Sequence, residues 1–295
     1  MTIADDIKES FRKGSTLTRL IYFNLAAFVL IKACYVIFFL FNKGEWFELF
    51  VTGAFAVPAA LPQLAAKPWT ILTYMFLHLD FLHILFNILW LYWFGKVFLA
   101  HLTGRQMLSV YFLGGLSGAV LYILAFNLFP VFNSILQKSA ALGASAAVMA
   151  VAVAIAVYLP DYIFYLVFIG PVKIKYIILF FFITDILMIG NGNAGGHLAH
   201  IGGAVFGYWF AIQYRKGNDI TRWFNRIMEQ PATWFKSKPR IKVTYGSSRF
   251  DDYEYNKRKA DEQEEIDRIL DKIAKSGYNN LTLKEKEKLF NAGHK

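Results

Sequence analysis

The chain has 295 residues, of which 56% are hydrophobic, and its formal net charge is +10. Soluble domains average about 45–50% apolar residues, so this excess, gathered into long runs, favours a membrane protein over a soluble one. The basic residues lie between the apolar runs and in the C-terminal part, which favours contact with anionic lipid and argues against a nucleic-acid partner. The single cysteine, Cys34, excludes an intrachain disulfide framework.

Six apolar segments approach the length of about 20 residues that a spanning helix needs. We therefore expect an all-α membrane protein, a bundle with spans at residues 20–41, 79–99, 107–129, 143–159, 174–189 and 197–214. Several spans are interrupted by Gly, Asn or His, which lipid tolerates only where a neighbouring helix or a polar cavity receives the polar group. These interruptions predict function inside the bundle.

The placement of lysine and arginine in the short loops predicts the orientation of the bundle. One side would hold ten basic residues: Lys8, Arg12, Lys13, Arg19, Lys96, Arg105, Lys173, Lys175, Arg215 and Lys216. The other side would hold Lys43, Lys67 and Lys138. We therefore expect an integral membrane protein with both termini in the cytoplasm, residues 1–19 forming a cytoplasmic segment and 42–77 an external loop.

The composition changes after residue 214. Residues 215–245 are interpreted as an amphipathic basic segment on the membrane surface, because apolar side chains such as Ile220 and Ile227 recur there at helical spacing. Residues 246–295 are expected to form a small cytoplasmic helical tail, in which Thr282 and Glu285 make a capping-box pattern. The tail carries no visible chemistry and is either a docking module or a passive extension.

Four histidines and one serine gather near the external ends of three spans. Histidine is costly in lipid, so His78, His83, His197 and His200 at one depth predict a site. Ser145, at the external start of the fourth span, should lie at the same depth, about one turn inside its helix. A serine hydroxyl becomes a nucleophile when a positioned base removes its proton, and histidine suits that task. Ser145 is thus the predicted nucleophile, and helix phase alone leaves His197 and His200 as candidate bases.

Small residues would let these helices approach closely. Gly203 and Gly207 mark one face of the sixth span, and Ala146, Ala150 and Ala154 mark one face of the fourth. Such stripes allow tight packing of membrane helices, and packing alone explains them equally well.

Acyl transfer also needs donors for a developing oxyanion. His83 and Asn87 stand at i and i+4 on the second helix and so share a face; the alternative is a hydrogen-bonded pair that ties helices together. No carboxylate is expected to orient His200, because Asp185 is interpreted as structural. A serine–histidine dyad is the resulting hypothesis.

These residues resemble the rhomboid family of intramembrane serine proteases over about residues 20–214. The family's Gly-x-Ser-Gly motif corresponds to Gly143-Ala144-Ser145-Ala146. Its Ala-His-x-x-Gly-x-x-x-Gly motif corresponds to Ala199, His200, Gly203 and Gly207. Its His-x-x-x-Asn pattern corresponds to His83 and Asn87. Ala146 replaces the second glycine of the serine motif. The resemblance selects His200 over His197 and implies the six-span bacterial form, located in the inner membrane.

The resemblance implies a serine endopeptidase that cleaves single-span or polytopic membrane proteins near their external ends. Ser145 would attack the scissile carbonyl, His200 would move the proton, and His83, Asn87 and the Ser145 amide would hold the oxyanion. No cofactor or metal is expected, and the oligomeric state stays open. Residues 180–182 and the loop at 191–196 would form a gate and a cap, although a tight connection explains that loop equally well.

Two alternatives remain open. A catalytically silent rhomboid-like protein that binds membrane clients would have the same fold, although it need not keep both Ser145 and His200. A metal-dependent membrane enzyme or transporter would use the four clustered histidines, with Asp80 as the nearby carboxylate. Serine-directed labelling and insensitivity to chelators separate the three hypotheses.

Overall fold

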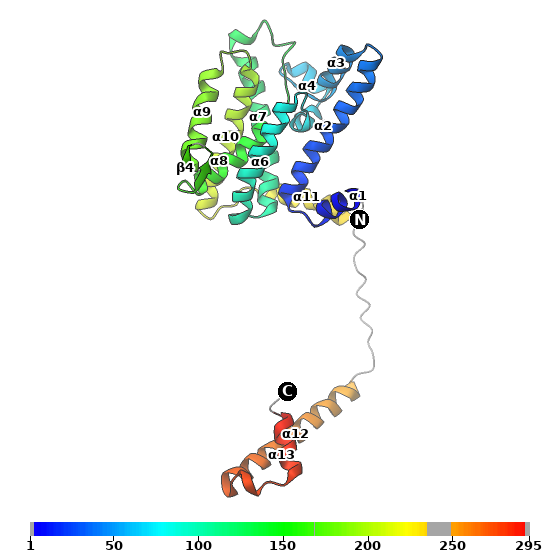
Figure 1. Cartoon of the computed structure of the whole chain (residues 1–295), viewed down its shortest axis with the longest axis vertical. Helices are drawn as coiled ribbons and strands as arrows, with labels where there is room; N and C mark the ends of the chain where they lie inside the picture. Colours follow the sequence, from blue (N-terminus) through cyan, green and yellow to red (C-terminus); the bar gives the residue numbers. More distant parts are fainter. Residues whose placement is uncertain (1–2, 168, 235–248, 293–295) are drawn as a thin grey trace. The chain divides into compact units, whose positions relative to one another are not determined.

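The computed structural model describes residues 3–167, 169–234 and 249–292, and it is mostly helical (Figure 1). It divides into two compact units, Met1–Phe235 and Lys236–Lys295. The first unit contains every residue of the predicted site. The domain boundary expected between residues 245 and 246 lies outside the described residues.

All six segments expected as spans are helices. They are α2 (Thr16–Leu40), α6 (Phe81–His101), α7 (Gly104–Leu128), α8 (Ser145–Tyr158), α9 (Ile174–Met188) and α10 (Ala194–Arg215). Among the described residues, α2, α6 and α7 are long and apolar enough to cross a membrane, and α8 is a shorter apolar helix. Six crossings therefore remain a prediction.

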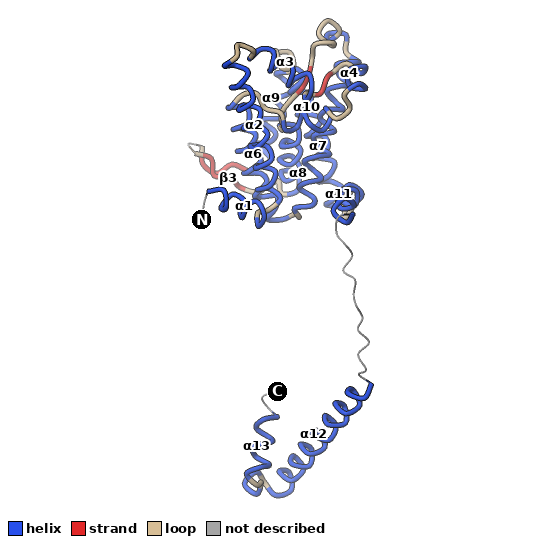
Figure 2. Tube along the Cα trace, turned by 90° about the vertical axis from the view of Figure 1, so that its right-hand side faces the viewer, coloured by secondary structure: helices blue, strands red, loops and turns tan. Residues whose placement is uncertain are grey.

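Shorter helices lie at the two ends of this bundle. They are α1 (Ile3–Lys13), α3 (Gly44–Phe55), α4 (Leu61–Ala66), α5 (Thr70–Thr73), η1 (Tyr74–Phe76), η2 (Pro130–Phe132) and α11 (Arg222–Trp234). Figure 2 shows α3 and α4 at one end and α1 and α11 at the other. The segment expected as an external loop, 42–77, is thus largely folded into short helices.

The expectation of an all-α fold is incomplete, because the first unit also holds two short antiparallel strand pairs. β1 (Val57–Pro58) pairs with β2 (Ala140–Ala141), and β3 (Ile163–Leu166) pairs with β4 (Gly170–Lys173). Hydrophobic periodicity does not reveal strands of two to four residues, yet polar backbone groups in an apolar protein must still be paired. The β1–β2 pair anchors the chain four residues before Ser145 is reached.

The centre of the bundle is α8, which is buried along almost its whole length between α7 and α10. Glycines make this approach close. A Cβ added to Gly203 would collide with the backbone of Ala146, and one added to Gly207 would collide with the backbone of Ala150. From α7, a Cβ on Gly118 would lie 2.6 Å from the Ala146 Cβ. The predicted close packing of the two small-residue stripes is confirmed.

Replacing Gly203 with valine should destabilise the folded protein by about 1–3 kcal/mol, the usual cost of forcing extra volume into a packed core. The side chain would meet backbone, which cannot rotate away. The measurement is the thermal transition of the purified protein in detergent. Gly190→Val is the matched control, because a Cβ there meets nothing within 4 Å. Equal transitions for the two variants would contradict the packing described for α8 and α10.

The second unit is a helical hairpin of α12 (Arg249–Ser276), η3 (Tyr278–Asn280) and α13 (Leu283–Ala292). The capping box predicted for the last helix is confirmed: the Thr282 amide donates to Glu285 Oε2 at 2.7 Å, and the Glu285 amide donates to Thr282 Oγ1 at 3.4 Å. An ion pair of 2.8 Å between Lys272 and Glu285 links the two helices. Among the described residues, the chemistry of the predicted site is confined to the first unit.

Candidate active site

A tight turn delivers Ser145 to the start of α8. Gly143 has φ +116, a conformation that side-chain-bearing residues rarely adopt. Two hydrogen bonds hold the turn: the Gly143 amide donates to the Tyr74 carbonyl at 2.8 Å, and the Ala144 amide donates to His78 Nε2 at 3.3 Å. Ser145 is therefore the first residue of its helix, not one turn inside it as expected. The amide at such a position has no acceptor within the helix and is free for another partner.

His78 supports this turn and does not line the neighbouring cavity. It is fully buried in the loop between η1 and α6. Burial, with His83 nearby as the second cause, lowers the pKa of His78 to about 4. The ring is therefore neutral near pH 7, with Nδ1 3.4 Å from the Phe76 carbonyl and Nε2 accepting from the Ala144 amide.

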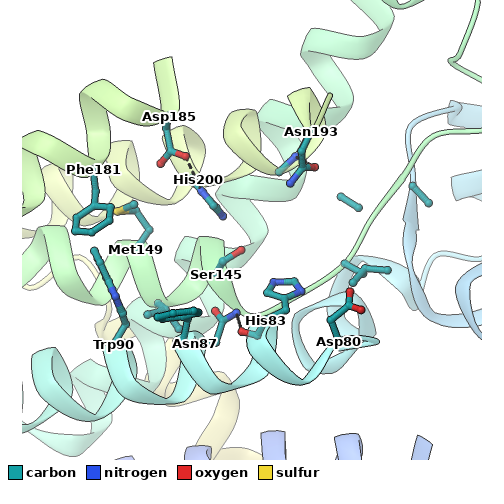
Figure 3. Close-up of a pocket in the computed structure, with 16 residues that line it drawn as sticks. Asp80, His83, Asn87, Trp90, Ser145, Met149, Phe181, Asp185, Asn193 and His200 are labelled. Atoms are coloured by element: carbon teal, nitrogen blue, oxygen red, sulfur yellow. Dashed lines mark hydrogen bonds and ion pairs between the residues drawn. The ribbon is translucent and has the colours of Figure 1, made fainter. Parts of the chain in front are cut away.

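His83 and Asn87 lie on the first two turns of α6, on the side that faces Ser145 (Figure 3). The His83 ring rests against Gly143, where an added Cβ would lie 2.7 Å from His83 Cε1. Asn87 Nδ2 donates to the His83 carbonyl at 2.8 Å, within α6. That bond uses one of the two amide hydrogens of Asn87 and leaves the other for the cavity. In the described residues, no bond from Asn87 ties α6 to another helix.

The expectation that no carboxylate contacts His200 is wrong. Asp185 Oδ1, on α9, lies 2.9 Å from His200 Nδ1 and 2.7 Å from His197 Nδ1. The end of α9 lies beside the start of α10, and this packing, which brings Asp185 close to His200, could not be read from the sequence. A signal was present in the sequence: a carboxylate on an apolar helix is costly unless it has partners, and histidines are the natural candidates.

One cavity of about 630 Å³ brings the predicted residues together. Its lining includes Ser145, His200, His83, Asn87 and Asp185, from α6, α8, α9 and α10 (Figure 3). In the part of the chain that the structure describes, no hydrogen bond joins the Ser145 hydroxyl to His200. Catalytic hydrogen bonds commonly tighten only when substrate is bound.

Two aromatic side chains border the cavity between α6 and α9. The rings of Trp90 and Phe181 meet edge to face, with centroids 4.2 Å apart, and both line the cavity. Phe181 belongs to the segment 180–182 expected to act as a gate. Asn193, from the loop expected to act as a cap, also lines the cavity.

The four histidines form two pairs, not one cluster. The ring centroids of His78 and His83 are 5.0 Å apart, beside the turn that precedes Ser145. His197 and His200 both contact Asp185. Within the described ranges, the donor atoms that come within 4.8 Å of one another belong to Asp185, His197 and His200. Both Nδ1 atoms approach one carboxylate oxygen at hydrogen-bond distance, which is the geometry of an accepting carboxylate between two N–H donors.

Comparison with known proteins finds similar sequences for both units of the chain. A family model described as Rhomboid domain matches residues 65–217, and one described as Family of unknown function (DUF6576) matches residues 251–291. The chain is 32% identical over 158 residues to the "RHOMBOID-like protein 12, mitochondrial" of Arabidopsis thaliana, a match that covers 50% of this chain and 47% of that protein. The chain thus spans about half the length of this curated relative. The first model covers all the residues predicted for the site.

Proposed function

Since the chain belongs to the rhomboid family, we propose that it is an intramembrane serine endopeptidase with Ser145 as nucleophile and His200 as base. The rhomboid domain and the apolar helices indicate an integral membrane protein, and the family acts on membrane-protein substrates within the bilayer. The observation that carries the proposal is that Ser145, His200, His83 and Asn87 all line the same cavity.

In the proposed reaction, Ser145 Oγ attacks the scissile carbonyl carbon while His200 Nε2 takes the hydroxyl proton. The tetrahedral oxyanion accepts hydrogen bonds from the Ser145 amide and from the side chains of His83 and Asn87. The peptide C–N bond then breaks as His200 returns the proton to the leaving amine. Water entering the cavity then attacks the acyl carbon while His200 takes a proton from it, and His200 returns that proton to Ser145 Oγ as the acyl C–O bond breaks.

Removing one oxyanion donor should slow cleavage without preventing reaction of Ser145. Loss of a preorganised donor typically costs about 10²–10³ in rate, and the remaining donors soften the loss. Asn87→Ala and His83→Ala should therefore reduce kcat while a fluorophosphonate still labels the serine. His101→Ala, at the far end of α6, is the control. Joint loss of labelling and of thermal stability would assign the pair a structural role.

A catalytically silent client-binding protein is the second candidate. The relative is named only as rhomboid-like, and the described residues show no bond between Ser145 and His200. The test is incubation of purified wild-type protein in detergent with a panel of single-span substrates, with and without a chelator. Cleavage that resists the chelator supports the peptidase. Binding without cleavage supports the silent protein, and chelator-sensitive cleavage supports a metal enzyme.

The proposed topology has six spans in a bacterial inner membrane, with both termini of the chain in the cytoplasm. The basic residues of the short loops support this orientation, as does the position of α1 and α11 at one end of the bundle (Figure 2). The Arabidopsis relative is named as mitochondrial. Protease accessibility of tags at each terminus in inverted membrane vesicles tests the orientation.

A further inference from the structure

The cavity contains a buried carboxylate that a serine–histidine dyad does not require. Asp185 is only 6% exposed, on an otherwise apolar stretch of α9, and it contacts the predicted base. We propose that Asp185 is a positioning residue that holds the His200 imidazole with Nε2 directed toward Ser145. The reaction would then use an aspartate–histidine–serine triad. This inference rests on the proposed peptidase function.

The contact with Asp185 determines which nitrogen of the neutral His200 ring carries the proton. An ionised carboxylate only accepts hydrogen bonds, so Nδ1 of His200, 2.9 Å from Asp185 Oδ1, must carry a hydrogen. A neutral imidazole with its proton on Nδ1 has its lone pair on Nε2. That is the atom that must accept the proton of the Ser145 hydroxyl. The contact therefore selects the tautomer that the reaction needs.

The same contact fixes the orientation of the His200 ring. Among the described residues, Asp185 is the hydrogen-bond acceptor recorded for the His200 ring, and the neighbouring ring is His197, with centroids 6.1 Å apart. Without Asp185, the imidazole, whose side chain is 23% exposed, would be free to rotate about its side-chain bonds in the cavity. The carboxylate on α9 thus holds a ring that belongs to α10.

Asp185 would also stabilise the charge that develops on His200 during the reaction. When His200 takes the serine proton it becomes an imidazolium, and a carboxylate beside it stabilises that charge. His197 donates to the same oxygen at 2.7 Å and so helps to offset the cost of burying an ion on an apolar helix. The titratable groups that face His200 are Asp185 from α9, His197 from α10 and His83 from α6.

The test compares Asp185→Asn and Asp185→Glu with the wild-type full chain, purified in detergent, on a single-span substrate. Asparagine keeps the shape and one accepting oxygen but loses the charge. We expect kcat to fall by between about tenfold and about 10⁴-fold, the range seen when orienting partners are removed from other enzymes. KM should change little, because Asp185 does not bind substrate in this scheme. Asp185→Glu should restore part of kcat.

Labelling of Ser145 by a fluorophosphonate gives a second readout, since its rate reports the reactivity of the serine without peptide cleavage. It should fall in parallel with kcat in Asp185→Asn and recover partly in Asp185→Glu. The matched control is Asp161→Asn: Asp161 is exposed and pairs with Lys173 and Lys175 outside the cavity. It should leave both rates unchanged.

The outcomes separate this inference from the proposed function. Wild-type activity with an unchanged kcat in Asp185→Asn would overturn the inference and leave the peptidase intact. A loss of kcat that vanishes well below the variant's unfolding temperature would make Asp185 a stabilising residue only. Wild-type cleavage that changes with added Zn²⁺ or a chelator would reassign Asp185, His197 and His200 to a metal. A wild-type protein that neither cleaves nor labels would overturn the function and the inference together.

Discussion

If the proposed mechanism holds, replacing Ser145 with alanine should reduce cleavage of a membrane substrate to the uncatalysed background, a loss on the order of 10⁶-fold, as measured in subtilisin. The reaction depends on one hydroxyl, and no neighbouring side chain can form the acyl intermediate in its place. The measurement is product formation from a single-span substrate by purified protein. Folding should be unaffected, because no hydrogen bond of the Ser145 hydroxyl is recorded in the described residues.

Ser139→Ala is the matched control for this substitution. Its hydroxyl donates to the Ile135 carbonyl at 2.9 Å in the segment leading to β2, and it does not line the cavity. It should retain wild-type activity. Cleavage that persists in Ser145→Ala would remove the serine mechanism.

Replacing His200 with alanine should also bring cleavage to background, whereas His197→Ala should lose about tenfold to 100-fold, the usual effect of removing a supporting hydrogen bond. Both rings donate to Asp185 at similar distances, so that contact does not separate them. Their positions relative to the cavity distinguish the two histidines: His200 lines it together with Ser145, and His197 is not among its lining residues. The measurement is kcat for both variants on one substrate. Greater damage from His197→Ala would show that the sixth-helix motif has been assigned to the wrong histidine.

The helices of the bundle could be predicted from the sequence because long apolar runs leave few alternatives in lipid. Each expected span agrees with a helix to within a few residues; for example, 174–189 was expected and α9 is Ile174–Met188. The short helices before α6 and the β1–β2 strand pair could not be predicted, because they depend on contacts with distant segments. The pairing of Val57 with Ala141 is one such contact.

The site was predicted where local spacing determines geometry. His83 and Asn87 are one turn apart on α6, and both line the cavity with Ser145. Two features depended on tertiary structure. The positive φ of Gly143 places Ser145 at the first position of α8, and the packing of α9 against α10 brings Asp185 to His200. A sequence gives the period of a helix but not the rotation at which it packs.

The second unit was predicted as a helical tail because its signals are local. An amphipathic repeat and a capping box do not require distant contacts, and both correspond to observed helices. Its matching family is one of unknown function. Comparing the activity of the full chain with that of a chain shortened by this hairpin would distinguish a docking module from a passive extension.

The most direct test of the central claim is to map the site of covalent labelling. The purified full chain is treated with a fluorophosphonate, digested and analysed by mass spectrometry. We predict a single adduct on the peptide that carries Ser145, at a rate reduced to background in His200→Ala. An adduct on a different serine, or efficient substrate cleavage with no adduct at Ser145, would contradict the assignment of Ser145 as the nucleophile.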